Sequence, residues 1–187
     1  SYRVPDTLFI RNETNASQLI DSPVTVDVSF FTSSGVVTRT ATNGTVNLTG
    51  LPVGGKFVVD VDASDSNYTE RTAFIQSIYQ QQTVYLLNTN VTDTIESRFV
   101  LEDPTGQFGA ETVLFIEKPV NATNSTTYQT VAADEFGVEG VTATLQQGQR
   151  YRLRVQNQQG VAQVVGPYRA DVSETVTVRP GTPTINI

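Results

Sequence analysis

The fold is decided by residues 42–61, which read TNGTVNLTGLPVGGKFVVDV. Asn43-Gly44 is the residue pair most typical of a type I′ turn, in which both central residues have positive φ. Alternating apolar residues follow it at Val46 and Leu48, and again at Phe57, Val59 and Val61. A period of two is that of a β-strand with one buried face. The stretch predicts a hairpin of strands 36–41 and 45–49, followed by a strand over 57–62.

Similar alternating or β-branched runs recur along the whole chain. We expect strands at 7–11, 24–31, 36–41, 45–49, 57–62, 72–78, 83–87, 95–101, 112–117, 128–132, 141–145, 151–155, 161–165 and 175–179. Hydrophobic residues make up 38% of the 187 residues and charged residues 17%, a composition that can build a folded core. Short, regularly spaced strands separated by turns predict an all-β sandwich.

The chain also repeats itself, because residues 134–155 read DEFGVEGVTATLQQGQRYRLRV. An offset of 94 aligns Phe57 with Tyr151, Val59 with Leu153, Val61 with Val155 and Phe74 with Tyr168. An offset of 91 aligns residues 8–10 with residues 99–101. We therefore expect two tandem Ig-like or prealbumin-like antiparallel β-sandwich domains, residues 1–91 and residues 92–187, the second with an extended C-terminal tail.

The repeated segment resembles a known family. The positions that carry the resemblance are Gly44, Val46, Leu48, Gly50, Leu51, Pro52, Gly54, Phe57, Val59 and Val61. Their pattern is similar to that of the carboxypeptidase regulatory-like, or prealbumin-like, β-sandwich domain, as found in cell-surface proteins of archaea, halophiles included. The resemblance implies a sandwich fold and leaves function open, because such modules serve as stalks, adhesin parts and enzyme appendages.

The absent residue types exclude several kinds of chemistry. The chain has no Cys, His, Met or Trp. It therefore cannot carry a Ser-His-Asp triad, a cysteine nucleophile, a disulfide or the usual ligands of zinc, copper and haem. The carboxylate pairs Glu102–Asp103 and Asp134–Glu135 would point to opposite faces of a strand, which makes them poor acid/base partners. We expect a protein that is not an enzyme.

The asparagines indicate the compartment. Eight of the eleven stand in Asn-X-Ser/Thr sequons: Asn12, Asn15, Asn43, Asn47, Asn67, Asn90, Asn121 and Asn124. This frequency predicts a glycosylated extracellular or cell-surface protein. A chain without Met that starts at Ser1 is also what removal of a signal peptide leaves. The net charge of −7 disfavours binding to nucleic acid. The sequence contains no apolar run of 18 residues, so it predicts no membrane span within these residues.

One acidic cluster could hold a metal ion. Asp60, Asp62, Asp65 and Asn67 follow one another in the segment DVDASDSN. Oxygen ligands at this spacing suit Ca²⁺, although the glycine and the closing glutamate of an EF-hand are missing. The alternative is a solvated acidic strand end followed by a turn. Calcium is thus the one cofactor that the sequence leaves open.

Two further features predict subunit contacts. Arg150, Arg152 and Arg154 line one face of a strand, and the offset of 94 places Arg154 where the first copy has Asp60. An acidic face in one copy and a basic face in the other could meet head to tail between subunits. A solvated face or cross-strand pairing with Glu is the alternative. Ile185 and Ile187 share a face of a C-terminal segment that could add to a neighbour's sheet edge, or else form a linker.

These observations favour a non-enzymatic extracellular structural protein, a glycosylated subunit of a cell-surface filament, appendage or surface layer. An adhesin-type binding module is one alternative, for which Tyr68, Tyr79 and Tyr85 would converge on one surface. Accessory β-sandwich domains of a larger secreted protein are the other.

Overall fold

The structure is a computed structural model that describes residues 7–21, 24–30, 36–49, 57–63, 67–75, 83–121 and 124–180. Several positions singled out above lie outside the described residues: Gly50, Leu51, Pro52, Gly54, Asp65, Tyr79, Ile185 and Ile187. The side chains of Phe57, Asn121 and Asn124 also lie outside them.

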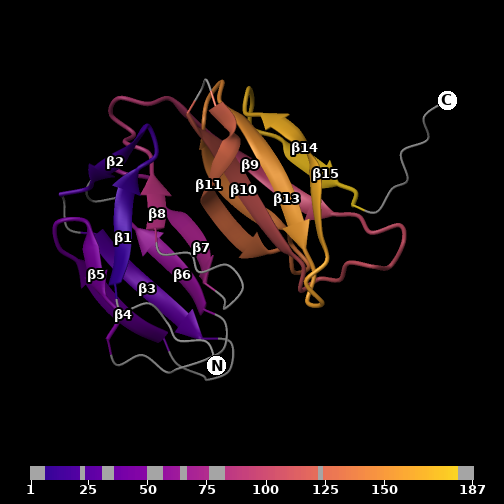
Figure 1. The fold of residues 1–187 in the computed structure, drawn as a ribbon, viewed down its shortest axis with the longest axis horizontal. Coiled ribbons are helices and arrows are strands. Elements are labelled where there is room, and N and C mark those ends of the chain that lie inside the picture. Colours follow the sequence, from indigo (N-terminus) through magenta and orange to yellow (C-terminus); the bar gives the residue numbers. More distant parts are fainter. Residues whose placement is uncertain are drawn as a thin grey trace. The chain divides into compact units, whose positions relative to one another are not determined.

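Every regular element in the described part of the chain is a β-strand, which confirms the all-β prediction (Figure 1). The strands are β1 (Thr7–Asn12), β2 (Asn15–Leu19), β3 (Val24–Phe30), β4 (Val36–Ala41), β5 (Thr45–Asn47), β6 (Phe57–Asp62), β7 (Arg71–Ile75), β8 (Thr83–Leu86), β9 (Thr94–Leu101), β10 (Val113–Asn121), β11 (Asn124–Glu135), β12 (Val141–Gln146), β13 (Arg150–Gln156), β14 (Ala162–Arg169) and β15 (Thr175–Val178).

The chain divides into two compact units. Unit 1 comprises Ser1–Thr94 and Thr130–Ala132. In one of its sheets the order is β2-β1-β5, with β8 also pairing with β1, and in the other it is β4-β3-β6-β7. Ile10 of the first sheet and Val59 of the second belong to one buried cluster. The sheets therefore pack face to face, and each fully buried aliphatic side chain contributes about 1.5–3 kcal/mol.

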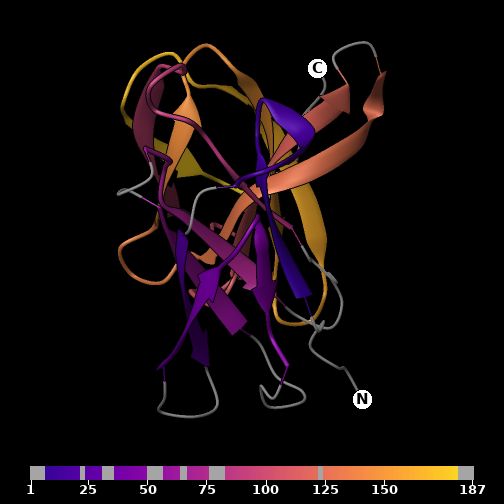
Figure 2. The same ribbon diagram turned by 90° about the vertical axis from the view of Figure 1, so that its left-hand side faces the viewer.

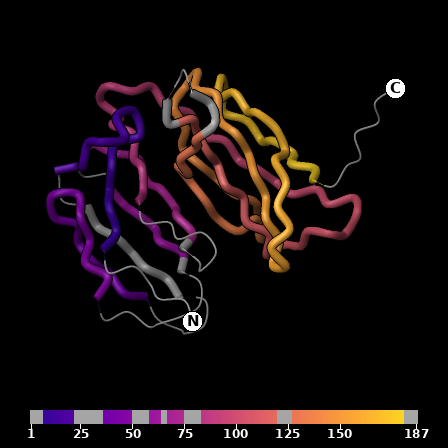
Figure 3. The backbone as a smooth tube through the Cα atoms, in the orientation of Figure 1, coloured from indigo at the N-terminus to yellow at the C-terminus, as the bar shows by residue number. Residues whose placement is uncertain are grey.

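Unit 2 comprises Ile95–Gln129 and Ala133–Ile187. Its sheets have the orders β11-β10-β13-β14 and β12-β9-β15, and the chain path through them can be followed in Figure 3. Phe99 on β9 and Tyr168 on β14 meet edge to face, with ring centroids 5.3 Å apart. The Tyr168 hydroxyl lies 2.8 Å from the buried Ser97 Oγ. These contacts join the two sheets, so unit 2 is also a sandwich.

The predicted type I′ turn is present, but it connects two sheets. Asn43 and Gly44 have φ values of 52° and 75°, and Thr42 and Thr45 exchange backbone hydrogen bonds of 2.9 and 3.0 Å. Beyond this bridge the strands diverge, because β4 pairs with β3 and β5 pairs with β1. The turn is therefore the corner at which the chain passes from one layer of unit 1 to the other. Figure 2 gives a second view of unit 1, whose colours run from indigo to magenta.

The two units share one strand order once β2 is set aside. The sheet β4-β3-β6-β7 corresponds to β11-β10-β13-β14, and β5-β1-β8 corresponds to β12-β9-β15. In both units the first and last strands pair in parallel, with Ile10 opposite Val84 and Leu101 opposite Val178. These parallel pairs lie within a fold that the sequence predicted to be antiparallel.

Two other details differ from the expectation. Strand β2 carries polar, largely exposed residues and has no alternating apolar pattern to predict it. The alignment of Phe74 with Tyr168 is wrong by one residue, because Ile75 lies opposite Phe57 and Tyr168 lies opposite Tyr151. In a strand such a slip reverses the face on which a side chain lies.

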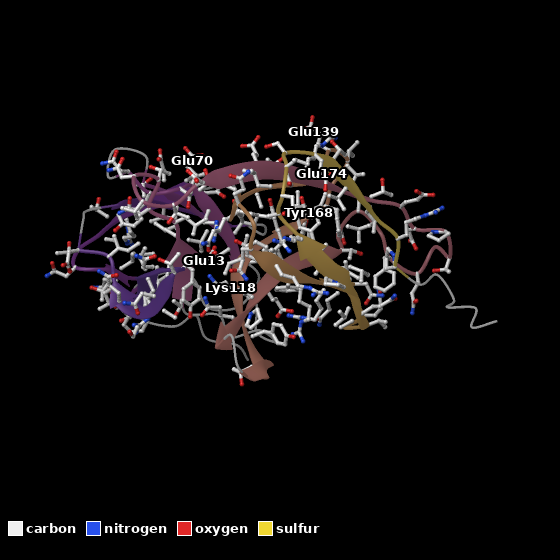
Figure 4. The ribbon with its side chains drawn as sticks, turned by 90° about the horizontal axis from the view of Figure 1, so that it is seen from above. Glu13, Glu70, Lys118, Glu139, Tyr168 and Glu174 are labelled. Carbon is white, nitrogen blue, oxygen red and sulfur yellow. The ribbon has the colours of Figure 1, made fainter. Side chains whose placement is uncertain are left out.

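Unit 1 also contains a buried ion pair. Arg71 Nη2 lies 2.7 Å from Glu13 Oε1, and both side chains are almost fully shielded from water (Glu13 is labelled in Figure 4). Arg71 Nη1 donates a hydrogen bond of 2.9 Å to the carbonyl of Tyr85. The pair fastens the turn between β1 and β2 to β7 and β8. Removal of either partner would leave a buried charge uncompensated.

Candidate functional site

The three arginines of β13 lie on the outer face of unit 2, as the alternation predicts. Tyr151, Leu153 and Val155 are buried in the sandwich, so Arg150, Arg152 and Arg154 project from the opposite side of the strand. Because β13 lies between β10 and β14, these side chains have neighbours on both sides. Together with Glu117 and Tyr128 they form what we call the arginine face.

Glu117 on β10 is the anionic centre of the arginine face. It lies directly opposite Arg152 in the sheet register. Its Oε1 lies 2.9 Å from Arg152 Nη2 and 3.4 Å from Arg154 Nε. Glu117 is nearly buried, whereas the two arginines are partly exposed. Cross-strand pairing with Glu, the alternative offered by the sequence, is thus what these two arginines do within unit 2.

Aromatic rings fix the positions of the same two arginines. The Arg152 guanidinium carbon lies 3.6 Å from the centroid of the Tyr128 ring, and that of Arg154 lies 4.2 Å from the centroid of Phe115. A cation–π contact contributes about 0.5–2 kcal/mol and restricts the rotamers of the arginine. The guanidinium groups are therefore ordered before any partner arrives, which lowers the entropy cost of binding.

Arg150 gives the arginine face its excess positive charge. It is exposed and lies directly opposite Arg169, so two like charges occupy neighbouring positions. Arg169 is paired with Asp171 at 3.0 Å, and both of these side chains are largely exposed. A surface pair of this kind is weak, because water screens it. An anionic partner would relieve the repulsion between Arg150 and Arg169.

A groove of about 530 Å³ runs beside these arginines. Its walls include Tyr128, Arg152, Val164 and Pro167. It therefore combines an aromatic ring, a guanidinium and apolar surface, which suits an extended segment that carries acidic side chains.

Strand β14 closes the sheet on one side and is protected against pairing. Its register with β13 shifts between Leu153 and Arg154, where a bulge interrupts the ladder. Pro167 has no N–H, and proline is tolerated in an edge strand where the missing donor would face solvent. A bulge and a proline are two ways in which edge strands avoid pairing with other chains. A partner on this side of unit 2 is therefore expected to contact the side chains of the arginine face and not the backbone of the β14 edge.

The acidic strand β6 occupies in unit 1 the position that β13 occupies in unit 2. Asp60 and Asp62 are exposed, whereas Val59 and Val61 are buried. Thr72 Oγ1 donates a hydrogen bond of 2.9 Å to Asp60 Oδ1. Asn67 is exposed, and its backbone oxygen accepts hydrogen bonds from Thr89.

Calcium binding at this strand stays a prediction. Within the ranges that the structure describes, no three acidic side chains gather closely enough to hold a metal ion. Asp65, the third carboxylate of the predicted set, lies outside them.

The sequon asparagines with described side chains lie at the surface. Asn15, Asn43, Asn47, Asn67 and Asn90 are exposed and Asn12 is half-buried. In three sequons the hydroxyl of the Ser or Thr donates to Oδ1 of the asparagine: Thr14 to Asn12, Ser17 to Asn15, and Thr49 to Asn47. Asn12 differs from the other two because its Nδ2 also donates to Gln18 Oε1 at 3.3 Å. Glycosylation at these positions stays a prediction.

Of the three tyrosines named for a binding module, the two within the described residues, Tyr68 and Tyr85, lie partly inside unit 1. Tyr68 packs against the unit 1 core, and Tyr85 is half-buried. Burial raises the pKa of the Tyr85 hydroxyl, and the positive charge of Arg11 opposes that shift.

The adjacent carboxylates have structural partners. Glu102 pairs with Arg179 at 2.7 Å, and Asp103 Oδ2 accepts the backbone N–H of Phe108 at 2.8 Å. Asp134 Oδ1 accepts the N–H of Glu135 at 2.8 Å. Each contact holds a turn or a strand end in place.

Sequence reasoning did not find Glu117 and Tyr128 as members of the arginine face. Both lie in predicted strands, but the partner of a strand is not contained in its own sequence pattern. One sequence signal could have found Glu117. Phe115 and Glu117 alternate with the apolar Leu114 and Ile116, so in a strand Glu117 lies on the face opposite to Leu114 and Ile116, where it can meet a neighbouring strand's side chains.

No protein-family model matches the chain, and no curated protein matches it in sequence. In the described part of the chain there is no helix long and apolar enough to cross a membrane.

The comparison with solved structures finds several distantly similar proteins. The Bacillus anthracis TIE protein has a TM-score of 0.35 and 10% identity, over 92% of this chain and 32% of that one. This chain thus spans about a third of its length. GBS52, the minor pilin of Streptococcus agalactiae, has a TM-score of 0.32 and 12% identity, over 98% of this chain and all of that one. A streptococcal ancillary pilin has a TM-score of 0.26 and 14% identity, over 93% of this chain and 62% of that one.

Proposed function

We propose that the chain is a non-enzymatic structural protein of the cell exterior, a glycosylated subunit of a filament, appendage or surface layer. The observation that carries the proposal is the arginine face on β13, together with the exposed carboxylates Asp60 and Asp62 on the corresponding strand β6. The outer side of the four-stranded sheet thus carries negative charge on β6 in unit 1 and positive charge on β13 in unit 2.

Opposite charges at equivalent positions support head-to-tail assembly. The arginine face of one subunit would meet the acidic strand of the next, and each subunit would keep one face of each kind free. Such a heterologous contact extends into a filament or lattice unless its rotation closes a ring. The groove beside Tyr128 adds apolar area to the contact. The ordered arginines would fix the orientation in which the next subunit binds.

Assembly of the purified chain at rising ionic strength tests this contact. We expect light scattering and electron micrographs to show assemblies at low salt that dissociate as salt screens the charges. Arg152→Glu with Arg154→Glu should prevent assembly. Arg98→Glu with Arg179→Glu makes the same change in net charge elsewhere in unit 2 and should leave assembly intact. Assembly that ignores both salt and the first pair of substitutions contradicts the proposal.

The remaining parts of the proposal rest on the sequence. The sequons support secretion and glycosylation, and the acidic, lysine-poor composition with the motif of residues 44–61 supports a carboxypeptidase regulatory-like surface domain of the archaeal type. Calcium at Asp60, Asp62, Asp65 and Asn67 and strand exchange through Ile185 and Ile187 are also proposals. Mass spectrometry of native material tests the glycans, and the protein's N-terminus in that material tests signal-peptide removal.

A further inference from the structure

Two loops of unit 2 form a pocket at one end of strand β13. The first connects β9 to β10, and the second, residues 157–161, connects β13 to β14. The pocket is a half-open depression of about 400 Å³, a volume within the range of small-molecule sites. Its lining includes Gln107, Glu111 and Thr112 from the first loop. Asn157, Gln158 and Gln159 line it from the second.

Hydrogen bonds within and between the two loops fix the backbone around the pocket. The nearly buried Asn157 donates from Nδ2 to the carbonyl of Gln107 at 3.1 Å. Its Oδ1 accepts the N–H groups of Gln159 at 3.0 Å and Val161 at 2.8 Å. Gln158 Nε2 donates to the carbonyl of Glu111 at 3.3 Å. The backbone around the pocket is therefore fixed without a ligand, which reduces the cost of binding one.

One polar group at this pocket has no partner. Thr112 is buried, and its Oγ1 makes no hydrogen bond. The backbone of Thr112 is bonded normally, since its N–H donates to Gly109 and its carbonyl accepts from Phe136. A buried hydroxyl without a partner is unfavourable, and native structures contain few of them. Thr112 lines the pocket, but its Oγ1 is shielded from solvent, so a rotation about χ1 would bring the hydroxyl to a ligand, and a hydrogen bond there would remove this cost.

The lining also restricts what the ligand can be. Glu111 is the one charged residue among the described residues that line the pocket, so an anion would be repelled. No aromatic or large apolar side chain stands among them, so a flat hydrophobic ligand would bury little surface. Amides and hydroxyls both donate and accept hydrogen bonds, which makes them complementary to sugar hydroxyls.

We infer that this loop pocket binds a neutral, hydroxyl-rich ligand, namely one or two units of an uncharged saccharide. The inference goes beyond the proposed structural role and favours the adhesin-type alternative for this end of unit 2. It is independent of the arginine face, since the two sites have no residue in common.

Two-dimensional NMR of the ¹⁵N-labelled chain tests the inference. The probes are the methyl glycosides of glucose, galactose, mannose and N-acetylglucosamine, together with methyl glucuronide as a charged control. We expect at least one neutral glycoside to shift the amide signals of residues 106–112 and 157–160 saturably. The charged control should bind at least fivefold more weakly. No shift in these loops, or equal binding of the charged control, overturns the inference.

Two variants, one of them with a matched control, sharpen the test. Gln158→Ala should weaken binding about fivefold or more. Gln147→Ala should not, although Gln147 Nε2 also donates to a backbone carbonyl at 3.3 Å, because it lies at the other end of β13. Thr112→Val removes the unpartnered hydroxyl, so it should weaken binding without loss of stability. Unchanged affinity in both Gln158→Ala and Thr112→Val contradicts the inference.

Discussion

Glu117 and Arg152 are direct cross-strand neighbours on β10 and β13, with 2.9 Å between Oε1 and Nη2. The carboxylate is 7% exposed and the arginine 31%, so the anion lies beneath the cations. One carboxylate thereby orders two guanidinium groups, and the geometry of the arginine face depends on it.

Replacement of that anion should destabilise unit 2. Glu117→Gln leaves Arg152 and Arg154 without their counter-charge, and we expect the free energy of unfolding to fall by about 1–3 kcal/mol. Urea unfolding followed by circular dichroism measures the change. Glu102→Gln is the control, because Glu102 and Arg179 form an exposed pair whose loss should cost less than about 1 kcal/mol. Equal losses for both variants would show that burial of Glu117 has no energetic effect.

The hydroxyl of Tyr168 should make stability depend on alkaline pH. Burial raises its pKa above 10.0, the hydrogen bond from Ser97 opposes this, and the nearby Glu174 adds to it. Tyr168 and Glu174 lie on the same side of unit 2 in Figure 4. The folded state therefore keeps its proton at a pH where the unfolded state has lost it. The stability that the protonated Tyr168 hydroxyl contributes to the fold is fully present below pH 10, and it is lost as the pH rises through the pKa of the folded state.

Denaturant titrations between pH 8 and pH 11 measure that dependence. Tyr168→Phe should unfold with a shallower decline at alkaline pH, and near neutral pH it should cost about 1 kcal/mol through loss of the bond to Ser97. An identical alkaline decline in the variant and the parent chain contradicts the assignment to Tyr168.

The corner turn at Gly44 should not tolerate a side chain. Gly44 has φ +75°, and a Cβ there would lie 2.8 Å from Leu19 Cβ and 3.0 Å from the carbonyl oxygen of Ile10. Gly160 has φ +84° but open space around it. Gly160→Ala should therefore cost about 1–2 kcal/mol for the left-handed backbone alone, and Gly44→Ala clearly more. Thermal unfolding compares the two, and equal costs would mean that the close contact relaxes freely.

The edge of β14 should become adhesive when its proline is removed. Pro167→Thr restores an N–H on the solvent side of the strand, so we expect self-association through backbone pairing. Sedimentation velocity distinguishes this association from the proposed charge-driven assembly, because backbone pairing should persist at high salt. A variant that stays monomeric at high salt would show that the bulge alone protects the edge.

Much of the fold could be predicted because apolar alternation marks the buried face of a strand. The strand over 36–41 and the strand over 57–62 have the predicted bounds, and Asn43-Gly44 forms the predicted turn. Strand β2 could not be predicted, because its residues face solvent on both sides and their polar pattern resembles that of a loop. The divergence of β4 and β5 was hidden for a related reason, since local turn geometry does not reveal which sheet each strand joins.

The arginine face was predicted only in part. Alternation places Arg152 and Arg154 on one face of a strand, and the structure places them there. That Glu117 lies between them depends on which strands are neighbours, and Tyr128 reaches the same spot from another strand. Such long-range pairing arises from the packing of the whole sandwich. The buried Glu13–Arg71 pair was missed for the same reason, because its two residues are distant in sequence and look like ordinary surface charges.

The parallel pairing of the first and last strands has a mechanical consequence. In unit 1 the chain enters at the start of β1 and leaves at the end of β8, and in unit 2 it enters with β9 and leaves with β15. Because paired parallel strands run in the same direction, these entry and exit points lie at opposite ends of each pair. Tension along the backbone would therefore pull the two strands past each other in shear. The inter-strand hydrogen bonds would bear the force together, and they could not peel apart one at a time.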